Sequence, residues 1–148
     1  MYSFASSVSR TVMVGLTAAT LSMATLAADP AKSLYERLGG KPALSAVVGE
    51  LWAQVAADVR INSRFAHTKP EVFGAQLVDF LCQASGGPCK YSGADMKTAH
   101  TGMKLSDAEF SALAEDTVKA LDKFSVPATE KDEVMNMLGS LKGDVVNR

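Results

Sequence analysis

The sequence has few of the residues from which proteins build metal centres and disulfide scaffolds. Its 148 residues include two cysteines and two histidines, His67 and His100. Two cysteines are too few for a disulfide-dense scaffold or a four-thiolate zinc site. Two histidines limit imidazole chemistry to two positions, and no Glu-x-x-His pair is present for a di-iron helix bundle.

An excess of charge is also missing. Fifteen Lys and Arg against sixteen Asp and Glu give a net charge of −1, which argues against nucleic acid as a partner. Hydrophobic residues make up 47% and charged residues 21%, so long disordered stretches and fibrous repeats are excluded. The length suits one ordinary domain.

The common catalytic motifs are absent as well. The sequence has no Gly-x-Gly-x-x-Gly, no phosphate-binding P-loop and no His-Glu-x-x-His. It lacks Cys-x-x-Cys-His, which excludes covalent haem attachment of the c type. Composition leaves a Ser–His–acid triad open, but nothing marks a nucleophile elbow.

Residues 1–28 have the three parts of a secretory signal peptide. They contain no acidic residue, a single cation at Arg10, and then a run of apolar and small residues that ends at Ala27-Ala28. The alternative is a transmembrane anchor, but Thr and Ser residues dilute the run below a confident apolar span of about 20 residues. We expect cleavage after Ala27 or Ala28, export to the bacterial periplasm, and a mature domain of residues 29–148 free of the membrane.

The mature chain is predicted to be all-α. Strand signals are scarce, whereas apolar residues recur at helical spacing over about 43–57, 70–85, 107–124 and 129–145. A short helix over about 94–101 places Met96 and His100 on one face. Cys82 and Cys89 flank a chain break at Gly86-Gly87-Pro88. In an oxidising compartment we expect them to form a disulfide, the alternative being two reduced thiols.

A single histidine on a short helix, facing helices rich in aromatic residues, is the minimum equipment for non-covalent haem binding. Spacing alone does not decide between that use and ordinary packing of a helical core. Four motifs in order add to it: Leu34-Tyr35-Glu36-Arg37-Leu38-Gly39-Gly40, Gly86-Gly87-Pro88, Tyr91-Ser92-Gly93 and Met96-Lys97-x-x-His100-x-Gly102. Together they resemble the truncated haemoglobins of group I, small two-over-two helical globins, from about residue 34 to residue 146.

The resemblance implies a haem b (iron protoporphyrin IX) bound through Nε2 of His100, the proximal ligand. It implies that Phe65 packs on the haem face and that four further residues line the pocket: Phe80, Leu81, Met96 and Phe110. We interpret His67, two residues beyond Phe65, as a solvated corner residue rather than a sixth ligand.

The distal side departs from the family pattern. Trp52 stands where group I members usually have a tyrosine that donates a hydrogen bond to the gas ligand. The partner positions are Phe73, Gln76 and Leu77. Tryptophan donates through its indole N–H but does not accept, and Gln76 has two readings, a donor turned inward or a solvated residue at the pocket edge.

These implications lead to an expected function with two alternatives. The first is an exported haem protein that binds diatomic gases (O2, NO or CO) for oxygen transport, scavenging, sensing or NO dioxygenation. The second is a haem-based redox or peroxidase-like enzyme, against which the apolar set Trp52, Phe73 and Leu77 argues. The third is a cofactor-free helical interaction module. The sequence does not identify the reductant or the oligomeric state.

Overall fold

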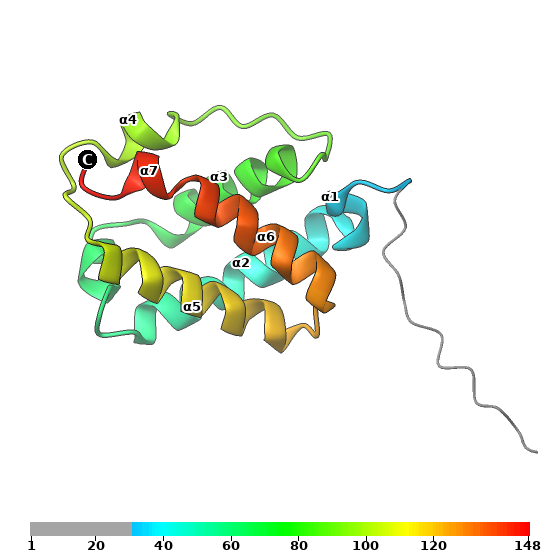
Figure 1. Ribbon diagram of the computed structural model, residues 1–148, viewed down its shortest axis with the longest axis horizontal. Coiled ribbons are helices and arrows are strands. Elements are labelled where there is room, and N and C mark those ends of the chain that lie inside the picture. Colours follow the sequence, from blue (N-terminus) through cyan, green and yellow to red (C-terminus); the bar gives the residue numbers. More distant parts are fainter. Residues whose placement is uncertain (1–30) are drawn as a thin grey trace, which may run out of the picture.

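The computed structural model describes residues 31–148, so the predicted signal peptide lies outside the described residues. Within this part of the chain the fold is helical (Figure 1), which confirms the predicted class. The elements in chain order are α1 (Leu34–Arg37), α2 (Gly40–Ala57), η1 (Asn62–Phe65), α3 (Pro70–Ala84), α4 (Met96–His100), α5 (Asp107–Lys123), α6 (Ala128–Ser140) and α7 (Lys142–Val145). No helix between residues 31 and 148 is long and apolar enough to cross a membrane.

Two helix boundaries differ from the sequence prediction. Helix α2 begins at Gly40, earlier than predicted, because Gly39 at its N-cap adopts a φ of +95° that turns the chain into the helix. The predicted last helix is interrupted, since α6 ends at Ser140 and α7 begins at Lys142. Glycines on both sides of this break, Gly139 and Gly143, lower the helix propensity there.

The long helices pack as two pairs. Helix α2 packs against both α3 and α5, and α5 packs against α6 (Figure 1). The short helix α4 packs against α7 at one end of the molecule, while α1 contacts α2 and α6. Arg37 of α1 secures the last contact by donating hydrogen bonds to Glu130 and Glu133 of α6, at 2.7 and 2.5 Å.

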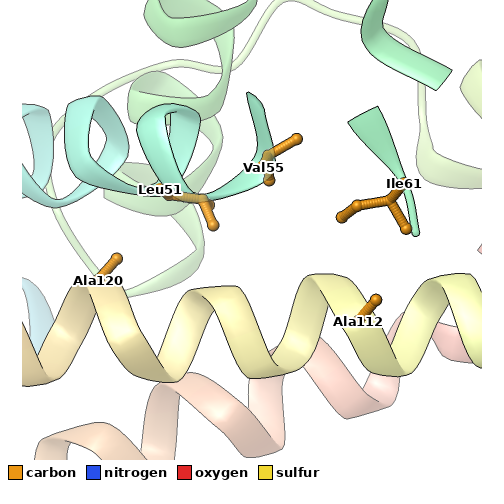
Figure 2. Packing of buried hydrophobic residues seen from close by; sticks show 5 residues of the cluster. All are labelled: Leu51, Val55, Ile61, Ala112 and Ala120. Atoms are coloured by element: carbon orange, nitrogen blue, oxygen red, sulfur yellow. The ribbon is translucent and has the colours of Figure 1, made fainter. Parts of the chain in front are cut away.

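The core between α2 and α5 depends on small residues. Leu51 and Val55 of α2 and Ile61 of the following loop face Ala112 and Ala120 of α5 (Figure 2), and all five are buried. Alanine at both α5 positions lets the two helices approach closely, so larger side chains on α2 fill the space between them. This contact fixes α2, and with it Trp52, relative to the second helix pair.

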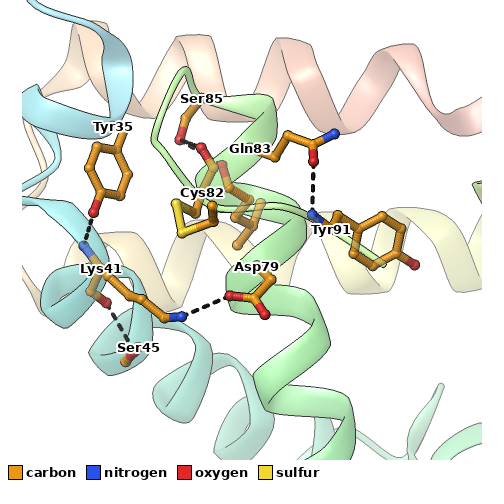
Figure 3. Close-up of a disulfide and its surroundings, with 10 residues drawn as sticks. Tyr35, Lys41, Ser45, Asp79, Cys82, Gln83, Ser85 and Tyr91 are labelled. Atoms are coloured by element: carbon orange, nitrogen blue, oxygen red, sulfur yellow. Dashed lines mark hydrogen bonds and ion pairs between the residues drawn. A yellow bond between two sulfur atoms is a disulfide. The ribbon is translucent and has the colours of Figure 1, made fainter. Parts of the chain in front are cut away.

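A second core joins α2 to α3 and contains the predicted disulfide. The structure links Cys82 to Cys89 with their Cα atoms 5.7 Å apart (Figure 3), which confirms the expected bridge. Cys82 is fully buried beside Leu44, Val48 and Val78. The chain returns through Gly87, where an added Cβ would lie 2.6 Å from the Tyr35 ring and 2.7 Å from the Cys82 sulfur.

Candidate functional site

His100 occupies the last turn of α4, a helix whose start is fixed by Asp95. The Asp95 carboxylate accepts hydrogen bonds from the backbone N–H and the hydroxyl of Thr98, at 2.9 and 2.7 Å. These two bonds, the hydroxyl first, lower the pKa of Asp95. Asp95 was not singled out from the sequence, although Asp-x-x-Thr ahead of a short helix is a recognisable capping signal.

The imidazole of His100 is oriented by its own helix. Its Nδ1 lies 2.7 Å from the backbone oxygen of Met96, one turn earlier. Because a carbonyl oxygen only accepts, Nδ1 donates the hydrogen bond, and in the neutral ring Nε2 then carries the lone pair. No hydrogen-bond partner is found for Nε2 among the described residues, and the side chain is half-buried. Metal-ligating histidines are commonly held in this way, with the second ring nitrogen donating to a carbonyl.

The protein itself offers one ligand at this position. Nowhere in residues 31–148 do three His, Cys, Asp or Glu side chains come together as a metal cluster. A metal bound at His100 would therefore take its other ligands from a non-protein group. A single imidazole as the one protein ligand fits a haem, whose macrocycle supplies four nitrogens.

Trp52 and Phe73, which the sequence assigned to the distal side, lie together with Phe65, which it assigned to the haem face. Trp52 of α2 is 6.0 Å from Phe65 of η1 and 5.8 Å from Phe73 of α3, measured between ring centroids. Phe65 and Phe73 are 5.6 Å apart in an edge-to-face arrangement. All three are half-buried. Three separate elements thus build one aromatic wall, which we call the distal trio.

A cavity of about 320 Å³ lies between α2, α3, α5 and α6. Three more of the predicted residues, Leu77, Phe80 and Leu81, are among those that line it. Its lining is almost entirely apolar. The two hydroxyls in the lining are already used, since Ser85 donates to the oxygen of Leu81 and Thr117 to that of Leu113. The space has the size and the apolar character of a small-molecule or cofactor site.

The remaining predicted residues take different positions. Phe110 of α5 is buried, Met96 is half-buried at the start of α4, and Gln76 of α3 is exposed to solvent. His67 is also exposed, in keeping with the reading of a solvated corner residue. The structure therefore brings eight of the ten predicted residues into three groups: the distal trio, the α3 face of the cavity, and the Met96–His100 turn. Phe110 and Gln76 lie outside these groups.

The segment between α3 and α4 is organised by Tyr91. Its ring packs edge-to-face on Phe80 with centroids 5.3 Å apart, and its backbone N–H donates to Gln83 at 2.8 Å (Figure 3). Its hydroxyl donates to the oxygen of Ala94 at 2.9 Å. The next turn needs Gly93, because an added Cβ there would lie 2.3 Å from the Tyr91 hydroxyl. The Tyr-Ser-Gly motif thus shapes the approach to α4.

Comparison with known proteins agrees with this geometry. The sequence model of the bacterial-like globins matches residues 33–147. The chain belongs to the bacterial-like globin family. The group 1 truncated haemoglobin of Tetrahymena pyriformis is 31% identical over 117 residues, covering 79% of this chain and 97% of that protein. The group 1 truncated haemoglobin GlbN of Mycolicibacterium paratuberculosis is 32% identical over 118 residues, covering 80% and 86%.

Solved globin structures show the same arrangement of helices. Truncated haemoglobin from Tetrahymena pyriformis, in its Fe(III) form, superposes with a TM-score of 0.76 at 31% identity, over 79% of this chain and all of that one. The two-over-two haemoglobin of a Synechococcus species, in the cyanomet state with covalently attached haem, gives 0.74 at 35% identity over the same shares. The predicted family and the two-over-two globin fold are confirmed, and this family implies a haem cofactor and gas binding at the haem.

Proposed function

We propose that this globin is exported to the periplasm, holds haem b without a covalent bond, and binds O2 or NO on the side of the haem opposite His100. The observation that carries the proposal is the Met96–His100 hydrogen bond of 2.7 Å, which leaves Nε2 as a free, oriented ligand. When bound, the haem supplies an iron atom that takes a diatomic gas. The chain's own residues supply one axial ligand and an apolar wall.

Non-covalent retention follows from the side chains at hand. Cys82 and Cys89 are joined to each other and are not free to attack a vinyl group. Apart from His100 the sequence has one histidine, His67, and it is exposed. Coordination by His100 and apolar contact therefore hold the group. Treatment of the purified protein with acidified organic solvent should extract the haem completely, and haem remaining on the polypeptide would contradict this proposal.

The side chains of the distal side favour reversible gas binding over peroxide chemistry. Trp52, Phe73 and Leu77 present no carboxylate or imidazole that could move a proton to or from a substrate. The indole N–H of Trp52 is the donor on this wall, and Gln76 is exposed. The ferrous protein should show a CO difference spectrum, and negligible turnover of hydrogen peroxide. Efficient peroxidase turnover would favour the redox alternative instead.

Export is supported by the composition of residues 1–28 and by the disulfide, a bond typical of oxidising compartments. Expression of the full chain in a Gram-negative host should yield a periplasmic protein that begins at Ala28 or Asp29. Recovery of the uncleaved chain in the membrane fraction would contradict this part of the proposal.

A further inference from the structure

The loop that follows His100 has an unusual conformation that depends on outside contacts. Gly102 and Lys104 have φ angles of +85° and +51°, and the second value is unfavourable for a residue with a side chain. Next to His100, the backbone N–H of Met103 donates to the His100 oxygen at 3.1 Å. This bond joins the loop to the turn that holds the imidazole.

Backbone hydrogen bonds connect this loop to the C-terminal residues. The N–H of Lys104 donates to the oxygen of Arg148, and the N–H of Asn147 donates to that of Leu105, each at 2.8 Å. Leu105 also forms an isolated parallel bridge with Val146. These contacts hold the loop beside α7, but they do not connect it to the distal trio.

Arg64 makes that connection. It precedes Phe65 in η1, and its Nη1 donates to the backbone oxygen of Met103 at 3.3 Å, while its Nε donates to Glu109 of α5 at 2.5 Å. Glu109 at the same time accepts from the backbone N–H of Ser106 in the capping box that starts α5. One guanidinium thus links the corner that carries Phe65, the start of α5, and the loop after His100.

Arg60 provides an internal comparison. It donates to Glu115 of α5 at 2.7 Å and to Asp58, so it also ties the α2–α3 connection to α5. Its side chain is 47% exposed against 43% for Arg64. The two arginines therefore match in charge, exposure and pairing with an α5 glutamate. They differ in two ways: Arg64 alone of the two donates to the loop after His100, and Arg60 alone donates to Asp58.

We propose that Arg64 is a positioning residue that couples the distal corner at Phe65 to the loop after His100, and so fixes the imidazole relative to the distal trio. The inference rests on the proposed function, in which His100 is the haem ligand. Arginine suits the task because its fork of donors reaches two acceptors in fixed directions, whereas lysine is a single point charge. The coupling predicts an effect on the His100 bond to haem iron that differs from a general loss of stability.

The test compares three purified holoproteins with the wild type: Arg64→Met, Arg64→Lys and the matched control Arg60→Met. Methionine keeps the apolar stem and removes the hydrogen bonds. The readouts are the iron–histidine stretching band of the ferrous protein by resonance Raman, the rate of haem transfer to excess apomyoglobin, amide hydrogen exchange at Met103 and Lys104, and the melting temperature.

We expect both Arg64 variants to shift or broaden the iron–histidine band and to speed amide exchange in the loop. They should also release haem roughly twofold to fivefold faster, because the loss of a partly exposed charged contact has an effect of about this size. Arg60→Met should lower the melting temperature at least as much as Arg64→Met, because it also loses the bonds to Asp58, with the other three readouts unchanged. Equal changes in Arg60→Met and Arg64→Met, no change in either, or full rescue by Arg64→Lys would overturn the proposal. A wild-type protein that takes up no haem would instead refute the proposed function, and amide exchange would then decide alone whether Arg64 holds the loop.

Discussion

The disulfide between Cys82 and Cys89 offers a prediction whose size follows from the structure. The two residues are seven positions apart, so the bridge closes a loop of about eight residues. The chain-entropy relation assigns such a loop about 2.5 kcal/mol of stabilisation. Because Cys82 is fully buried between α2 and α3, the double variant Cys82→Ala/Cys89→Ala also loses sulfur contacts in the core. We therefore expect a loss of about 2.5–4 kcal/mol.

For a domain of this size each kcal/mol corresponds to roughly 3–5 °C in melting temperature. Thermal melts should thus show the double variant roughly 8–20 °C below the oxidised wild type in the same ligand state. Dithiothreitol should lower the wild type toward the variant and leave the variant itself unchanged. Intact mass should find the untreated protein lighter than its reduced form by two hydrogen atoms. A wild-type melt insensitive to dithiothreitol, or two thiols alkylated in the native protein, would refute the reasoning.

Three further predictions concern the distal side, the chain return and the start of α5. Trp52→Tyr should slow O2 release in stopped-flow measurements, because a phenol hydrogen bond to the polarised ligand is worth on the order of 1–3 kcal/mol; unchanged release would count against the placement of this side chain. Gly87→Ala should cost about 1–3 kcal/mol in denaturant melts, since its Cβ would meet other atoms at 2.6 Å. The control Gly49→Ala, a helical site with nothing within 4 Å, should stabilise by about 0.5–1 kcal/mol. Hydrogen bonds from Arg64 and then from the α5 capping box lower the pKa of Glu109 from 4.5 to about 2. The ionised Glu109 carboxylate stabilises the fold at pH values above about 4.5, and this stabilisation is lost as the pH falls from about 4.5 to about 2. Glu109→Gln should therefore flatten the acid limb of a stability–pH profile.

Much of the fold could be predicted from the sequence because its signals are local. Apolar spacing identified the long helices, and the predicted start at residue 107 coincides with that of α5, where Ser106 and Glu109 form a capping box. The disulfide was also predictable, since the glycines and proline between the cysteines allow the chain to turn back. Each of these features depends on residues only a few positions apart.

Other features depend on contacts between distant residues and were not predictable in this way. The contact of Arg64 with Met103 joins positions 39 apart in the chain, and no pattern in either segment indicates it. The meeting of Trp52, Phe65 and Phe73 required the packing of three elements. The exposure of Gln76 likewise depends on the rotation of α3 against α2. For the site, the sequence could nominate candidate residues, and the structure was needed to show which of them lie together.

The central claim is that His100 alone attaches this globin to its haem iron. It is tested most directly by absorption spectra of wild type, His100→Ala and the control His67→Ala, purified in parallel, in the oxidised, reduced and CO-bound forms. Wild type and His67→Ala should show the same Soret band, and His100→Ala should lose haem binding or bind haem far more weakly. A His100→Ala protein with an unchanged Soret spectrum would contradict it.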